Sequence, residues 1–183
     1  MLTLPTLRLA ALLAFTGLGA AACISPPDYP DTPEIEFKSI TQQPRTNPLG
    51  GIENNVGITV SYRDGDGNLG MKEDEIRQAG NAPQSPNSYN YICTLQIRDG
   101  SNTFIDYNFT PIFPGYSGQF PYLPPAEQGD RAAPIRGDLT LNVVVTATPP
   151  VLPRGSVVRF KIKIKDRDLN ESNEVLTSPI TLQ

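Results

Sequence analysis

The residues best suited to carry chemistry form the loop Asp64-Gly65-Asp66-Gly67-Asn68, which directly follows a run of alternating apolar residues. Aspartate and asparagine oxygens stand at every second position, and the two intervening glycines permit the tight backbone that would turn them to one side. Calcium prefers about six to eight hard oxygen ligands of this kind. The spacing therefore indicates a calcium site built on Asp64, Asp66 and Asn68.

The same loop also has the composition of an ordinary turn, because Asp and Asn side chains bond to nearby backbone and tolerate positive φ. Both interpretations stay open. The spacing is similar to the start of an EF-hand loop, with Glu75 at the twelfth place, but Leu69 stands where that motif requires glycine. An alternating, strand-like stretch also precedes the loop. We therefore expect either a turn or a calcium loop on a β scaffold, and not an EF-hand.

The composition excludes several other kinds of site. The chain contains no histidine, so a Ser-His-Asp or Cys-His arrangement and imidazole-based zinc sites are impossible. Paired carboxylates could still hydrolyse sugars, but there is no tryptophan to form a broad sugar platform. The chain has 15 Lys and Arg against 19 Asp and Glu, without a dominant basic patch, so nucleic acid is not an expected partner. We expect a protein that is not an enzyme.

The elements that would position the acidic loop read as β-strands. Short stretches of alternating apolar residues recur between turn residues, and no stretch keeps a helical period over three turns, although Lys72 to Gln78 could form a turn or two. About seven strands are expected, at 35–40, 55–63, 91–97, 105–109, 139–145, 158–164 and 176–182. This pattern predicts an all-β fold, a single immunoglobulin-like antiparallel β-sandwich over residues 35–183. The stretch 158–182 resembles the last hairpin of bacterial immunoglobulin-like and fibronectin-type domains.

A second acidic loop, Asp166-Arg167-Asp168, is expected to meet the first. In such a sandwich the second and sixth strands run in the same direction and face each other across the core. By strand parity, Asp64 and Asp166 both continue an inward face. Two such carboxylates repel unless something neutralises them, and a calcium ion, Arg63 or Arg167 could do so. The expected metal ligands are thus Asp64, Asp66 and Asn68 together with Asp166 and Asp168.

Residues 1–22 have the layout of a secretory signal, which is removed on export. One positive charge, Arg8, precedes a short apolar span, and small residues follow at 18–22. Cys23 stands directly after them. With a cysteine at this place, the segment resembles the signal of bacterial lipoproteins, whose cysteine becomes the lipidated first residue. Because 20–22 are all alanine, ordinary secretion with cleavage at the same bond is the alternative.

The resemblance implies a membrane partner through a lipid on Cys23, and a location in the cell envelope, at the outer membrane. Residues 23–34 fit such an anchor, since they contain four prolines and form a stiff, extended spacer. If Cys23 carries lipid, Cys93 has no disulfide partner. Cys93 stands at an inward position of its strand, so we expect a small buried hydrophobe.

Residues 109–125 concentrate Phe and Tyr in a Pro-rich connection. They could cover an open end or edge of the sandwich, which we favour, or be displayed to a peptide or glycan. Two functions follow as expectations. The first is a lipid-anchored envelope protein whose domain binds or scaffolds a protein or glycan without catalysis. The second is an accessory subunit of an outer-membrane machine for export or polysaccharide uptake.

Overall fold

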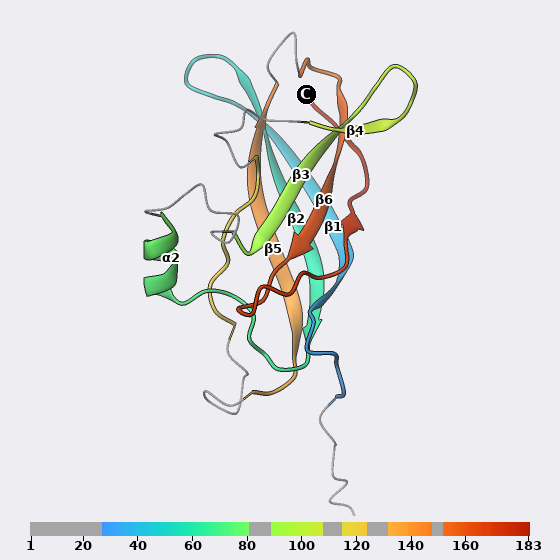
Figure 1. Cartoon of the computed structure of the whole chain (residues 1–183). Helices are drawn as coiled ribbons and strands as arrows, with labels where there is room; N and C mark the ends of the chain where they lie inside the picture. The colour runs from blue at the N-terminus through green and yellow to red at the C-terminus, as the bar shows by residue number, and fades with distance from the viewer. Residues whose placement is uncertain (1–26, 81–88, 108–114, 124–131, 148–151) are drawn as a thin grey trace, which may run out of the picture.

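Two antiparallel sheets pack face to face in the computed structural model, which describes residues 27–80, 89–107, 115–123, 132–147 and 152–183 (Figure 1). The first sheet contains three strands in the order β1 (Glu34–Thr46), β2 (Ile52–Asp64) and β5 (Ile135–Thr146). The second has the order β4 (Phe104–Asp106), β3 (Tyr91–Arg98), β6 (Val157–Ile164) and β7 (Val175–Leu176), with β8 (Ile180–Thr181) also paired to β6.

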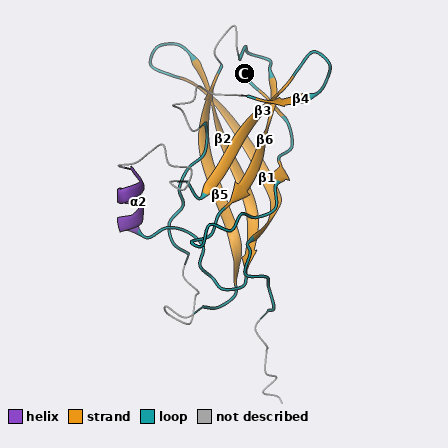
Figure 2. Ribbon diagram, viewed as in Figure 1, coloured by secondary structure: helices purple, strands orange, loops and turns teal. Residues whose placement is uncertain are grey.

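The distribution of strands between the sheets confirms the predicted immunoglobulin-like sandwich (Figure 2). The first, second and fifth strands form one sheet, whereas the third, sixth and last strands form the other, as in domains of this class. All pairings within the sheets are antiparallel. Edge strands β7 and β8 together occupy the place of the predicted seventh strand.

Alternation along the strands creates the core. On β2, Val56, Ile58 and Val60 are buried, and on β6 the inward residues include Phe160 and Ile162. The intervening positions of β2 and β6 are more exposed. Burial of these apolar faces against each other supplies the main driving force for closing the sandwich, at about 25 cal/mol per Å² of apolar surface.

Two apolar residues of the edge strands face outward. Ile105 is 53% exposed, because β4 is only three residues long and lies at the edge of its sheet. In the last strand Leu176 faces outward at 41% exposure, and its neighbour Val175 packs against the core. The backbone N–H of Thr177 donates to the carbonyl of Phe160, and this hydrogen bond fixes which residues of the last strand face the core.

The connection 115–123 covers one side of the core, as predicted for this part of the aromatic loop. Tyr91 and Gly118 exchange two backbone hydrogen bonds, and Phe120 is 4% exposed. Tyr116 meets Phe160 edge to face, with 6.0 Å between ring centroids. The predicted loop residues 109–114 and 124–125 lie outside the described part of the chain.

The first described residues and the C-terminus lie at opposite poles of the sandwich (Figure 1). Residues 27–33 enter at the pole where β2 ends, and the C-terminus lies near the start of β2, where the backbone of Gln183 donates to the side chain of Asn54. Helix α2 (Glu73–Gly80), expected as one or two turns, is set to one side of the strands (Figures 1 and 2).

Candidate functional site

Strands β2 and β6 bring the two acidic loops to the same pole, as predicted. Asp64 is the last residue of β2 and is fully buried, and Asp166 follows β6 and is 4% exposed. An isolated β-bridge between Leu69 and Asp166 joins the two loops directly. The inward parity of both carboxylates is therefore confirmed.

Asn68 connects three acidic side chains through its backbone N–H and its side-chain amide. Its backbone N–H donates to Asp64 Oδ2 at 3.1 Å and to Asp66 Oδ1 at 3.3 Å. Its side-chain Nδ2 donates to Asp66 Oδ2 at 2.9 Å and to Asp168 Oδ2 at 3.0 Å. Four of the five predicted ligand residues thus form one hydrogen-bonded cluster, which we call the acidic cluster: Asp64, Asp66, Asn68 and Asp168.

Asp166, the fifth predicted ligand residue, lies outside this hydrogen-bonded cluster. Its Oδ1 accepts the backbone N–H of Asn170 and its Oδ2 accepts Nδ2 of the same residue, both at 2.7 Å. Its carboxylate therefore closes the turn 166–170. Sequence reasoning missed Asn170, although an Asp followed four residues later by an Asn within a polar loop is a signal for such a turn.

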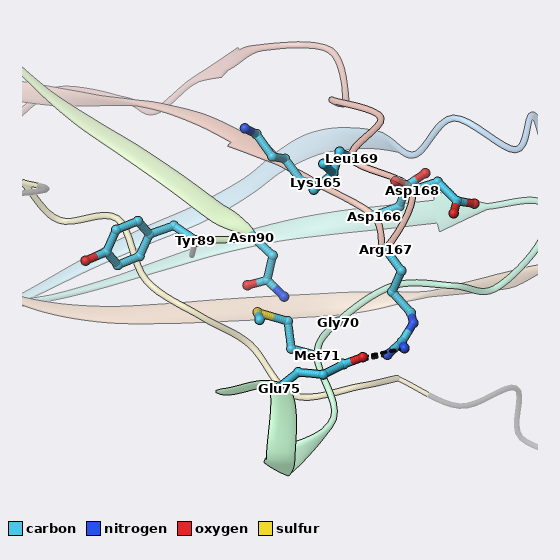
Figure 3. Close-up of a pocket in the computed structure, with 10 residues that line it drawn as sticks. All are labelled: Gly70, Met71, Glu75, Tyr89, Asn90, Lys165, Asp166, Arg167, Asp168 and Leu169. Carbon is cyan, nitrogen blue, oxygen red and sulfur yellow. Dashed lines mark hydrogen bonds and ion pairs between the residues drawn. The ribbon is translucent and has the colours of Figure 1, made fainter. Parts of the chain in front are cut away.

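Neither arginine lies between the carboxylates. Arg63 forms an ion pair with Glu34 on the outer face of the first sheet. Arg167 forms a two-pronged pair with Glu75, at 2.8 and 2.6 Å (Figure 3). Figure 3 shows Arg167 reaching toward α2 and away from Asp168. Glu75 is thereby engaged by a cation, which agrees with the expectation that this is not an EF-hand.

Two oxygens of the acidic cluster are buried without a hydrogen-bond partner. They are Asp64 Oδ1 and Asn68 Oδ1, and the hydroxyl of Tyr91 in the core is the third such side-chain atom in the described residues. A buried polar group without a partner costs about 1–3 kcal/mol. Both atoms of the cluster are acceptors, so only a donor or a cation can satisfy them.

The environment of Asp64 disfavours its charged form. Burial is the largest cause that raises the pKa of this carboxyl, to about 7, followed by repulsion from Asp66 and a hydrogen bond shared with it. Backbone N–H groups of Gly67 and Asn68 oppose the shift. The pKa of Tyr62 is raised as well, mainly by burial and in part by Asp138 and Asp64. A proton or a cation at Asp64 would relieve this unfavourable charge.

Carboxylates alone do not make a metal centre here. Within the described residues, no three Asp, Glu or Cys side chains converge closely enough to hold an ion by themselves. Any cation at this pole would also need the amide oxygen of Asn68, backbone carbonyls or water. Calcium accepts such ligands.

Two open clefts adjoin the acidic cluster. One, of about 310 Å³, is lined by residues that include Asp66, Asn68, Asp168 and Tyr122. The other, of about 410 Å³, lies between the 166–169 loop and α2 (Figure 3). In the second cleft Asn90 is engaged by the backbone of Phe120, through one donated and one accepted hydrogen bond.

The remaining sequence predictions concern the cysteines and the membrane. Cys93 is buried, and burial raises the pKa of its thiol, as fits a small core residue. Cys23 and the leader 1–22 lie outside the described residues. In the ranges that the structure describes, no helix has the length and apolar character needed to cross a membrane.

Comparison of the chain with protein-family models, with curated proteins and with solved structures gave no match. Its function is therefore argued from its own residues.

Proposed function

We propose that the chain is a lipid-anchored protein of the cell envelope, held at the outer membrane, whose immunoglobulin-like sandwich is a non-catalytic binding or scaffolding module. The observation that carries the proposal is the order of segments in the sequence. Cys23 stands directly between a secretory leader and a proline-rich spacer, and the sandwich begins at Glu34.

The end of the spacer supports this proposal, because it packs onto the sandwich. The carbonyl of Pro30 accepts the backbone N–H of Gly65 at 2.8 Å. Only six residue steps separate Cys23 from Tyr29, and they reach roughly 20 Å at most. A lipid on Cys23 would therefore hold the pole with the acidic cluster near the membrane and direct the C-terminal pole away from it.

A non-catalytic role is supported by the chemistry of the side chains. Without histidine, the usual general base is missing from the whole chain. The thiol of Cys93 is buried and has a raised pKa, so it is a poor nucleophile. Of the charged residues along the 410 Å³ cleft, Arg167 and Glu75 pair with each other and Lys165 pairs with Glu171.

Membrane fractionation tests the anchor. The wild-type protein should sediment with membranes and enter detergent, because two acyl signals give stable attachment. The Cys23→Ser variant should accumulate as soluble protein. If wild-type protein is soluble after its leader is removed, ordinary secretion is the better account.

The alternative role, an accessory subunit of an export or polysaccharide-uptake machine, is favoured by one feature of the fold. β5 (Ile135–Thr146) is long and lies at the edge of its sheet, where it could accept a strand from a partner protein. Purification from detergent-solubilised membranes separates the two roles. A partner in fixed proportion would favour the subunit, whereas binding of the soluble Cys23→Ser protein to a glycan or peptide array would favour an independent binding module.

A further inference from the structure

We propose that the acidic cluster binds one calcium ion through side-chain oxygens of Asp64, Asp66, Asn68 and Asp168. The inference goes beyond the proposed function and does not depend on it, because the cluster belongs to the folded sandwich whether or not Cys23 carries lipid.

The buried oxygens without partners are the first reason. Asp64 is fully buried at the end of β2, and its Oδ1 has no hydrogen-bond partner. Asn68 Oδ1, four residues away on the same loop, is also buried without a hydrogen-bond partner. In native proteins almost every buried polar atom has a partner, and a bound cation is one way to supply it. A divalent cation would serve both acceptors at once.

The position of the Asn68 amide is the second reason. Its Nδ2 donates at once to carboxylates from both loops, at 2.9 Å to Asp66 and 3.0 Å to Asp168. It is a neutral donor placed between two negative groups. Its Oδ1, on the same amide group, is the buried acceptor without a partner, so the side chain that links both loops also offers an oxygen to a cation.

The described cations around the cluster have other partners. Lys72, which lines the same cleft as Asp66 and Asp168, holds its ammonium over the ring of Tyr122, at 5.8 Å from the centroid. Arg63 and Arg167 are held by Glu34 and Glu75. Asp166 is left out of the ligand set, because its carboxylate closes its own turn through two hydrogen bonds to Asn170 and does not bond to the residues of the acidic cluster.

The predicted affinity is modest. Three carboxylates and one amide oxygen fall short of the about six to eight oxygens that calcium takes, so backbone carbonyls or water must complete the shell. A dissociation constant of about 10⁻⁴ to 10⁻³ M, typical of extracellular calcium modules, is therefore expected.

The test uses the mature full-length protein in detergent, stripped of metal by a chelator. Calcium at about ten times its dissociation constant should raise the melting temperature by about 3–6 °C, since the ion binds the folded state. Magnesium at the same concentration should have a smaller effect, because it demands a stricter geometry and gives up water reluctantly. Terbium should luminesce on binding, with Tyr122 of the adjacent cleft as a sensitiser, since the chain has no tryptophan.

The variants Asp64→Asn and Asp66→Asn keep the shape of the side chain and remove its charge. Each should weaken calcium binding by at least about tenfold. Asp99→Asn is the matched control. Asp99 holds a similar turn through Ser101 and Thr103, outside the cluster, so this variant should retain the full calcium response.

Three results would overturn the site. They are a melting temperature that ignores 10 mM calcium, an equal response to magnesium, and an equal calcium response in Asp66→Asn and wild type. Should Asp64→Asn fail to fold, Asp66→Asn decides alone, because its side chain lies in the open cleft.

Discussion

Polar side chains at the two poles differ in how fully they are hydrogen-bonded. Asn54, fully buried near the C-terminal pole, accepts from Gln42 and Gln183 and donates to the carbonyl of Val145. Asp64 is equally buried at the other pole, yet one of its oxygens has no partner. Asn54 holds the strands together, whereas Asp64 has a buried oxygen that a donor or a cation could satisfy. We therefore expect the two poles to respond differently to pH and cations.

The raised pKa of Asp64 predicts an unusual pH dependence of the calcium-free protein. Between about pH 4 and pH 7 the folded protein keeps a proton on Asp64 that the unfolded chain has lost. Stability from this group is therefore present at low pH and falls as pH rises through the folded pKa, by about 4 kcal/mol at most. Urea denaturation from pH 4 to 8 in chelator measures it.

The matched variant is Asp64→Asn, which removes the titration. Its calcium-free stability at pH 8 should exceed that of wild type, and the difference should shrink toward pH 4. Equal curves for the two proteins would show that Asp64 titrates normally.

The alternation of inward and outward residues along a strand explains how much of the acidic cluster could be predicted from the sequence. Alternation along β2 and β6 is enforced by the core, so the inward positions of Asp64 and Asp166 followed from their places after the last apolar residues. Side-chain partners did not follow, because loops offer several acceptors at similar distance. Asn170 satisfies Asp166, and Asn68 reaches across to Asp168, and only the folded geometry decides between such pairings.

Among the elements, central strands were predicted better than edges. β2 and β6 lie between neighbours and carry continuous apolar alternation, so their faces were clear. β6 was predicted to within one residue, whereas β2 begins at Ile52, three residues before the predicted start. β4 and β7 lie outside these strands and are only three and two residues long. Their burial depends on which part of the opposite sheet reaches them, and periodicity carries no such information. The outward faces of Ile105 and Leu176 could not be predicted from the sequence for this reason.

Because the spacer packs on the acidic loop, one methyl group added at Gly65 should disturb the contact between them. A Cβ at Gly65 would lie 2.3 Å from the carbonyl oxygen of Tyr29, so Gly65→Ala must displace the spacer. The hydrogen bond from residue 65 to Pro30 should be lost, with about 1 kcal/mol of stability. Hydrogen exchange at the amide of residue 65 should quicken, and proteases should cleave near residue 30 more readily.

Gly100→Ala is the control for this substitution. A Cβ at Gly100 meets no atom within 4 Å, and its φ is not in the left-handed region. If Gly65→Ala and Gly100→Ala behave alike, the spacer is not held by this contact, and the short reach to the membrane no longer follows.

At the scale of the whole molecule, the two poles of the sandwich carry different features. The spacer, the acidic cluster and the ends of β2 and β6 share one pole, and the C-terminus lies at the other (Figure 1). With lipid on Cys23, the first pole faces the membrane, and the far pole and the edge of β5 remain accessible to a partner. This orientation, together with the absence of histidine from the sequence, underlies the proposal of a binding or scaffolding module.

The mass of the N-terminal peptide of the mature protein, purified from membranes, tests the proposed anchor most directly. A chain that begins at Cys23 and carries a diacylglyceryl group on its sulfur, with or without a further acyl chain on its amine, is the predicted result. A chain that begins at Cys23 with an unmodified thiol, or one that retains residues 1–22, would contradict the lipid anchor and with it the proposed place of the protein in the envelope.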